Sequence, residues 1–174
     1  KDLKVIREDE MDFRKLLLIS LALLFALQAA AITIEELQDL YYQTEDAAEF
    51  SRAAGAFIEA SDALGELDHA FGLWQGFAPD SCQTWLETKA EDAAAAPKYK
   101  YLLLNLAEDV QTRLDGARGL ITAHPDFAGG YRALLLTLVQ DLAADELADP
   151  ESPFHSQLQS NLPLLAQFGA NFPG

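Results

Sequence analysis

Glu66 and His69 form the pair of residues in this sequence that comes closest to a metal-binding motif. Residues three positions apart lie on one side of a helix, so the carboxylate and the imidazole could reach the same metal ion. Di-iron carboxylate bundles use a Glu-x-x-His pair on each of two helices, with lone glutamates on two others. Here the pair occurs once, and the alternative is that both side chains face solvent. The identity of any metal is unknown from the sequence, and no cofactor is required by it.

Four glycines, an aspartate and a histidine on one side of the same predicted helix suggest a second candidate site. Gly55, Asp62, His69 and Gly76 are spaced by seven residues, and Gly65 and Gly72 lie between them on the same side. Because glycine lacks a Cβ, such a face lets a backbone or a flat ligand come unusually close. We therefore predict a ligand-binding face at Asp62, Gly65, His69 and Gly72, for a partner helix or a planar cofactor such as non-covalent haem. Covalent haem would need Cys-x-x-Cys-His, which is absent from the sequence. The alternative is tight packing of one helix against another.

Motifs of nucleophilic catalysis and of phosphate binding are absent from the sequence, so it identifies no catalytic residue and favours a protein that is not an enzyme.

Cys82 is the single cysteine. It leaves two alternatives open, an intermolecular disulfide and an unreactive, half-buried thiol. Trp85, Tyr99 and Tyr101 flank an alanine-rich connection, where they could form a partly exposed contact patch.

Long apolar stripes predict that these residues are carried on helices. Phe50, Phe57, Leu64 and Phe71 recur every seven residues, which predicts one helix from near Thr44 to Ala78. Further stripes predict helices over 99–121, 126–142 and 153–165, the last with Leu162 facing inward and with a kink or interruption at Pro163. Thr33-Ile-Glu-Glu36 is a capping box, and Ser152-Pro153 is typical of a helix start. Strand patterns are nearly absent.

The predicted fold is therefore all-α: an antiparallel bundle of four main helices with short extra helices. No internal repeat of fixed period is found, which disfavours a solenoid of the tetratricopeptide type. The domain boundaries follow from composition. Residues 1–10 are upstream or fragment-edge sequence, 11–31 a signal peptide, and 32–174 a single acidic helical domain.

An export signal is predicted at Met11 to Ala31. A basic start at Arg14 and Lys15 precedes an apolar run from Leu16 to Leu27 and the small residues Ala29 to Ala31. The run is shorter than the roughly 20 residues that a membrane-spanning helix needs. We therefore expect cleavage before Ile32 and a periplasmic or extracellular location, with no membrane association after cleavage. The alternative retains the segment as an uncleaved anchor.

The charge of the chain is strongly negative, with 12 Lys and Arg against 28 Asp and Glu, a formal net charge of −16. Residues 1–31 hold five charges of each sign, so the whole surplus belongs to the mature domain. Such a surface repels phosphate backbones, which excludes nucleic acid as a partner and favours a partner protein with a basic surface.

The predicted function is an exported, non-catalytic interaction or scaffold module of unknown oligomeric state. The alternative is a bundle that binds a small ligand, a metal or haem through the face at Asp62, Gly65, His69 and Gly72.

Overall fold

The computed structural model describes residues 32–91, 96–141 and 151–172, and the predicted leader, residues 1–31, lies outside them. The all-α prediction is confirmed, since the described residues form eight α-helices and one π-helical turn and no strand. In chain order these elements are α2 (Ile34–Gln43), α3 (Ala47–Ala60), α4 (Leu64–Phe77), α5 (Pro79–Ala90), α6 (Pro97–Leu104), α7 (Val110–Ala123), α8 (Ala128–Leu136), η1 (Thr137–Asp141) and α9 (Pro153–Asn171).

The helix starts that local sequence predicts are present. Thr33 Oγ1 accepts a hydrogen bond from the backbone N–H of Glu36, and the Glu36 carboxylate accepts one from the N–H of Thr33, so the capping box at α2 is complete. Ser152 caps α9 and Pro153 is its first residue. α9 continues through Pro163, so the predicted interruption of that helix does not occur.

The predicted helix from Thr44 to Ala78 is two helices, α3 and α4, joined at Ser61–Ala63. Neither proline nor glycine causes this break. The Lys98 ammonium reaches across from α6 and donates to the carbonyl oxygens of Glu59 and Ser61, each at 2.8 Å, and to Asp62 Oδ1 at 3.1 Å. These bonds satisfy carbonyls that the end of α3 leaves without a helical partner. A tertiary contact therefore stabilises the break.

A second predicted helix, over 99–121, is likewise divided into α6 and α7. Asp109 caps α7 by accepting hydrogen bonds from both the backbone N–H and the hydroxyl of Thr112, each at 2.7 Å. Arg113 donates to the carbonyl of Ala107 at 2.5 Å and so fixes the preceding turn. The two breaks turn two long helices into four short ones.

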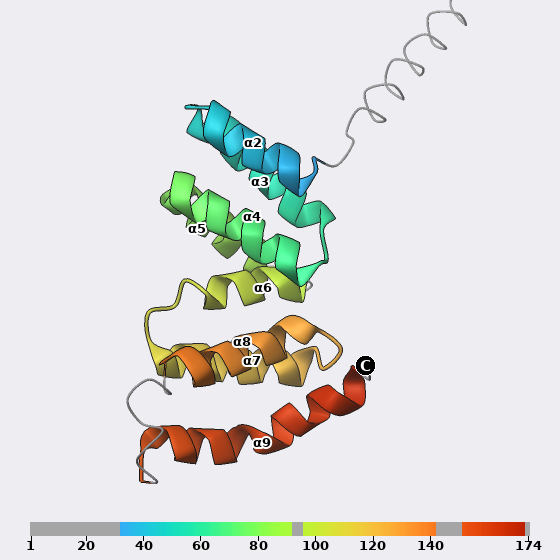
Figure 1. Cartoon of the computed structure of the whole chain (residues 1–174), viewed down its shortest axis with the longest axis vertical. Coiled ribbons are helices and arrows are strands. Elements are labelled where there is room, and N and C mark those ends of the chain that lie inside the picture. The colour runs from blue at the N-terminus through green and yellow to red at the C-terminus, as the bar shows by residue number, and fades with distance from the viewer. Residues whose placement is uncertain (1–31, 92–95, 142–150, 173–174) are drawn as a thin grey trace, which may run out of the picture.

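This division gives a stack of helices, and the predicted four-helix bundle is not confirmed. Substantial packing joins helices that are neighbours in the chain or two elements apart, as in α2 with α3 and α4, or α6 with α7 and α8. Figure 1 shows α2, α4 and α8 in front of α3, α5 and α7, with α2 at one end of the molecule and α9 at the other. Packing between near neighbours is typical of helical solenoids, although this sequence lacks their repeat.

The core runs along the middle of the stack. Phe50, Trp74 and Tyr101 are its largest fully buried side chains, and the Trp74 indole N–H donates to Ser51 Oγ at 3.0 Å. α7 and α8 pack closely at Gly130, where an added Cβ would lie 3.2 Å from the backbone nitrogen of Ile121. Glycine at this position therefore permits the close contact of the two helices.

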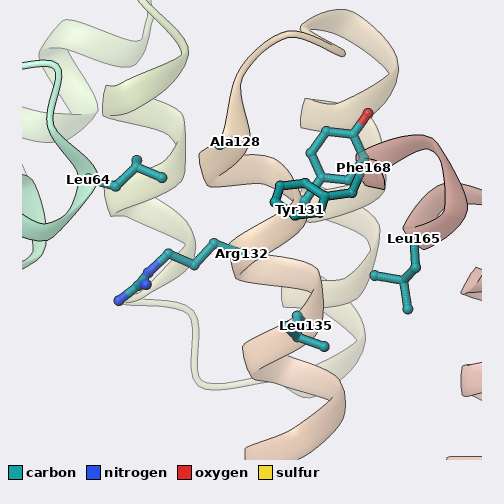
Figure 2. A pocket seen from close by; sticks show the side chains of 7 residues that line it. All are labelled: Leu64, Ala128, Tyr131, Arg132, Leu135, Leu165 and Phe168. Atoms are coloured by element: carbon teal, nitrogen blue, oxygen red, sulfur yellow. The ribbon is translucent and has the colours of Figure 1, made fainter. Parts of the chain in front are cut away.

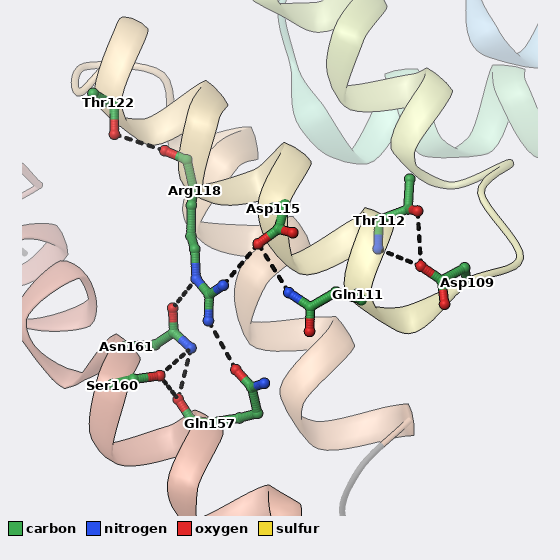
Figure 3. A network of polar contacts seen from close by, with 9 residues as sticks. All are labelled: Asp109, Gln111, Thr112, Asp115, Arg118, Thr122, Gln157, Ser160 and Asn161. Carbon is green, nitrogen blue, oxygen red and sulfur yellow. Dashed lines mark hydrogen bonds and ion pairs between the residues drawn. The ribbon is translucent and has the colours of Figure 1, made fainter.

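Polar side chains attach α9 to the rest of the stack. The guanidinium of Arg118 on α7 donates to Asn161 Oδ1 at 2.9 Å and to Gln157 Oε1 at 2.8 Å, and it pairs with Asp115 (Figure 3). Asn161 is fully buried. These partly buried hydrogen bonds fix the register of α9, because the planar guanidinium accepts few other arrangements.

Candidate functional site

The predicted ligand face is only partly assembled. Asp62 lies in the connection between α3 and α4, where its carboxylate pairs with Lys98 and its side chain is 92% exposed. Gly65, His69 and Gly72 share the exposed side of α4. An added Cβ at Gly65 or Gly72 would meet no atom within 4 Å, so the close approach of a second helix that we expected there is not found. The binding role of these four residues stays a prediction.

Gly55 and Gly76, which belong to the same spacing, do meet neighbours. A Cβ at Gly55 would lie 3.3 Å from the Trp85 indole, and one at Gly76 would lie 3.3 Å from the Tyr41 hydroxyl. These two glycines therefore accommodate half-buried aromatic side chains that pack against the core. Their role is packing, which is the alternative that the sequence left open for this face.

Glu66 and His69, the weak metal candidates, are both exposed on α4. The Glu66 carboxylate accepts a hydrogen bond from Ser61 Oγ at 2.7 Å. Within residues 32–91, 96–141 and 151–172, no three His, Cys, Asp or Glu side chains gather in a way that could hold a metal ion.

Cys82 lies in the core, and the predicted aromatic patch is buried only in part. The Cys82 side chain is fully buried, and this burial raises the pKa of its thiol, an effect that a hydrogen bond with Gln75 partly offsets. A disulfide to another chain would require α5 to move away from its neighbours. Tyr101 is fully buried as well, and Trp85 and Tyr99 are half-buried with their rings in edge-to-face contact.

The described residues also form an apolar groove of about 300 Å³ that the sequence did not predict. We call it the α4/α8/α9 groove. Figure 2 shows α8 as its floor, Leu64 of α4 on one side, and Leu165 and Phe168 of α9 on the other. Its lining residues are Leu64, Ala128, Tyr131, Arg132, Leu135, Leu165 and Phe168. Arg132 is the only charged side chain among them.

The charge of Arg132 is balanced within the protein. Its Nη2 lies 2.8 Å from Asp68 Oδ2, and the other oxygen of the same carboxylate accepts a hydrogen bond from the Tyr101 hydroxyl at 2.7 Å. Burial, together with the hydrogen bond to Asp68, raises the pKa of Tyr101 to about 12. Tyr101 is therefore a neutral donor at neutral pH. The three side chains connect α4, α6 and α8 at the edge of the groove.

This groove is suited to binding, because its lining supplies apolar area and one neutralised guanidinium. Sequence reasoning missed it because its residues come from three separate helices. One signal was available: α9 contains no Asp, Glu, Lys or Arg over its 19 residues, in a chain with a net charge of −16.

No described helix is both long and apolar enough to cross a membrane. Comparison of the chain with known protein families, with curated proteins and with solved structures finds no match.

Proposed function

We propose that this protein is an exported, non-catalytic helical scaffold that binds a basic protein partner through the acidic end of its stack. The proposal rests on the distribution of charge. The described ion pairs join Lys89 to Glu59, Lys98 to Asp62, Arg118 to Asp115 and Arg132 to Asp68. None of them involves a carboxylate of α2 or of the turn that follows it.

The acidic end consists of α2 and the start of α3. It carries six exposed carboxylates and, in the same segment, one cationic side chain, Arg52. The carboxylates are Glu35, Glu36, Asp39, Glu45, Asp46 and Glu49. An unbalanced cluster of one sign attracts a partner of the opposite sign and increases its rate of association. The stack of short helices supplies an extended surface for such a contact, as in helical solenoids.

The experiment for partner binding uses the chain as bait in the exported fraction of its source cells. The variant Glu35→Gln/Asp39→Asn removes two exposed carboxylates of α2. The matched control, Asp80→Asn/Glu87→Gln, removes two exposed carboxylates of α5 and so changes the net charge equally. We expect the native chain and the control to retain the same basic protein, and the α2 variant to lose it.

Salt provides the second criterion. Contacts between exposed charges are screened beyond about 8 Å at physiological ionic strength, so the retained protein should elute as salt is raised. A partner that stays bound at high salt, or that the α2 variant and the control lose equally, would contradict the proposal that the acidic end binds it. Turnover of a substrate by the purified chain would contradict the non-catalytic part of the proposal.

Export is the remaining part of the proposal, and its support is the order of basic, apolar and small residues from Met11 to Ala31. Expressed from Met11 in a bacterium, the chain should appear in the periplasmic fraction with an intact mass that corresponds to a start near Ile32. Recovery of the unshortened chain in the membrane fraction would favour the uncleaved anchor instead.

A further inference from the structure

A pocket between α6 and α7 differs in charge from the rest of this acidic chain. Its volume is about 240 Å³, and it lies where the two helices pack together in the middle part of the stack (Figure 1). α6 contributes Lys100 and Leu104, and α7 contributes two glycines, Leu120, Ala123 and its C-cap residue His124. The described lining therefore holds two basic side chains and no carboxylate, in a chain with a net charge of −16.

The two basic side chains have no charged partner in the part of the chain that the structure describes. Lys89, Lys98, Arg118 and Arg132 each pair with a carboxylate, whereas Lys100 makes no hydrogen bond or ion pair there, and neither does the imidazole of His124. Both side chains are half-buried. An ammonium in this position offers three donors, and an imidazole offers at least one N–H, so the pair is suited to a carboxylate.

The two glycines of α7 shape the apolar part of the pocket. A Cβ added at Gly116 would collide with Cδ2 of Leu104, so the Leu104 side chain fills the space over Gly116 and closes the pocket there. A Cβ added at Gly119 would meet no atom within 4 Å, so the space over this second glycine is open. A flat group can therefore lie directly against the backbone of α7 at Gly119.

The basic groups lie at the end of the pocket that is opposite to Leu104. Lys100 comes one turn before Leu104 on α6, and His124 comes eight residues after Gly116 on α7. The two helices are joined by the short connection 105–109 and run in opposite directions (Figure 1). Lys100 and His124 are therefore displaced in the same direction from the contact between Leu104 and Gly116. The pocket is apolar at one end and basic at the other.

We propose that this pocket binds a small aromatic carboxylate. The ring lies over Gly119, between Leu104 and Leu120, and the carboxylate accepts hydrogen bonds from the Lys100 ammonium and from the ring N–H of His124. The size is suitable, since a cavity of about 150 Å³ holds benzene and this pocket is larger. The site is separate from the acidic end, so the inference does not depend on the proposed partner protein.

The lining favours this ligand over other classes. An inorganic phosphate would leave the apolar end of the pocket uncovered, and it would bring a second negative charge to a strongly acidic protein. An amine would meet the charge of Lys100. The surplus of negative charge does not prevent binding of one carboxylate, because Lys100 acts on it at contact distance, whereas more distant carboxylates are screened by salt beyond about 8 Å.

The test is a nuclear magnetic resonance titration of the ¹⁵N-labelled full chain with benzoate, and with benzamide as the neutral ligand of the same size. We expect benzoate to shift the amide signals of Gly116 and Gly119 in a saturable way, with a dissociation constant below about 1 mM. Benzamide cannot form the charged contact with Lys100, so its dissociation constant should be at least about tenfold higher.

Two variants, each with a matched control, assign the two ends of the pocket. Lys100→Met removes the ammonium and should raise the dissociation constant for benzoate at least about tenfold, whereas Arg52→Met removes an exposed cation of α3 and should leave it unchanged. Gly119→Leu fills the open space and should abolish the shift at Gly116. Its control is Gly72→Leu, because Gly72 is likewise an exposed glycine within a helix whose Cβ would meet no atom within 4 Å. Circular dichroism should show the native helix content in all four variants.

Four results would overturn the inference. They are the absence of saturable shifts at the two glycines, equal affinities for benzoate and benzamide, equal effects of Lys100→Met and Arg52→Met, and binding that survives Gly119→Leu. The variant Glu35→Gln/Asp39→Asn should bind benzoate as the native chain does, because these carboxylates of α2 are outside the pocket. The pocket and the acidic end can therefore fail separately.

Discussion

Gly72 and Gly130 allow the packing of the stack to be tested with one chemical change at two sites. Gly72 lies in the middle of α4, and a Cβ added there meets no atom within 4 Å. Alanine is favoured over glycine inside a helix by about 1 kcal/mol, so Gly72→Ala should raise the free energy of unfolding by roughly that amount. Since 1 kcal/mol shifts the melting temperature of a domain of this size by about 3 °C, the gain is measurable.

Gly130 should respond in the opposite direction. A Cβ added there lies 3.0 Å from Ile121 Cγ1 and 3.2 Å from the Ile121 backbone nitrogen. A buried isoleucine and a helix backbone have little freedom to move, and overpacking of a core typically costs about 1–3 kcal/mol. Subtracting the propensity gain of about 1 kcal/mol leaves a net loss of roughly 1 kcal/mol for Gly130→Ala.

Urea denaturation of both variants, followed by circular dichroism, measures the two free energies on one scale. The expected difference between the variants is about 2 kcal/mol, from the sum of the gain and the loss above. A fall in stability for Gly72→Ala would show that a neighbour packs on the exposed side of α4, and the predicted ligand face would regain its support. A gain for Gly130→Ala would show that α7 and α8 do not pack as closely as described.

Two further predictions concern polar groups of the core. Lys98→Met keeps the apolar stem but removes the donors to Glu59, Ser61 and Asp62, so it should lower the free energy of unfolding by about 2 kcal/mol. The control Lys100→Met loses no hydrogen bond or ion pair within the described residues, so it should change that free energy by less than about 0.5 kcal/mol. Equal effects of the two variants in urea melts would show that Lys98 does not stabilise the break between α3 and α4. The pKa of Tyr101 is raised to about 12, so its neutral form should contribute stability that is complete below pH 10 and is lost as the pH rises through 12. Tyr101→Phe should flatten this decline of the free energy of unfolding with pH. Identical pH profiles of that free energy for the native and variant chains would argue against the hydrogen bond to Asp68.

The sequence predicted those parts of the fold that depend on neighbouring residues. The capping box at Thr33 and the start of α9 at Ser152 are contacts within a single turn, so their residues are readable without a tertiary structure. The boundary near Thr44 was predicted from the end of the seven-residue apolar stripe, and Asp46 caps α3 there by accepting hydrogen bonds from its first turn. The break at Ser61–Ala63 was missed because Lys98, 36 residues away from Asp62, stabilises it.

The missed break explains why the candidate site was predicted only in part. A continuous helix would have placed Asp62, His69 and Gly76 on one face, in register with Gly55. Once α3 and α4 are separate helices, the spacing of seven across the break carries no geometric meaning. The α4/α8/α9 groove could not be predicted from periodicity, because an apolar residue at a stripe position is assigned to the core. Leu162 satisfies that pattern and is nevertheless 52% exposed.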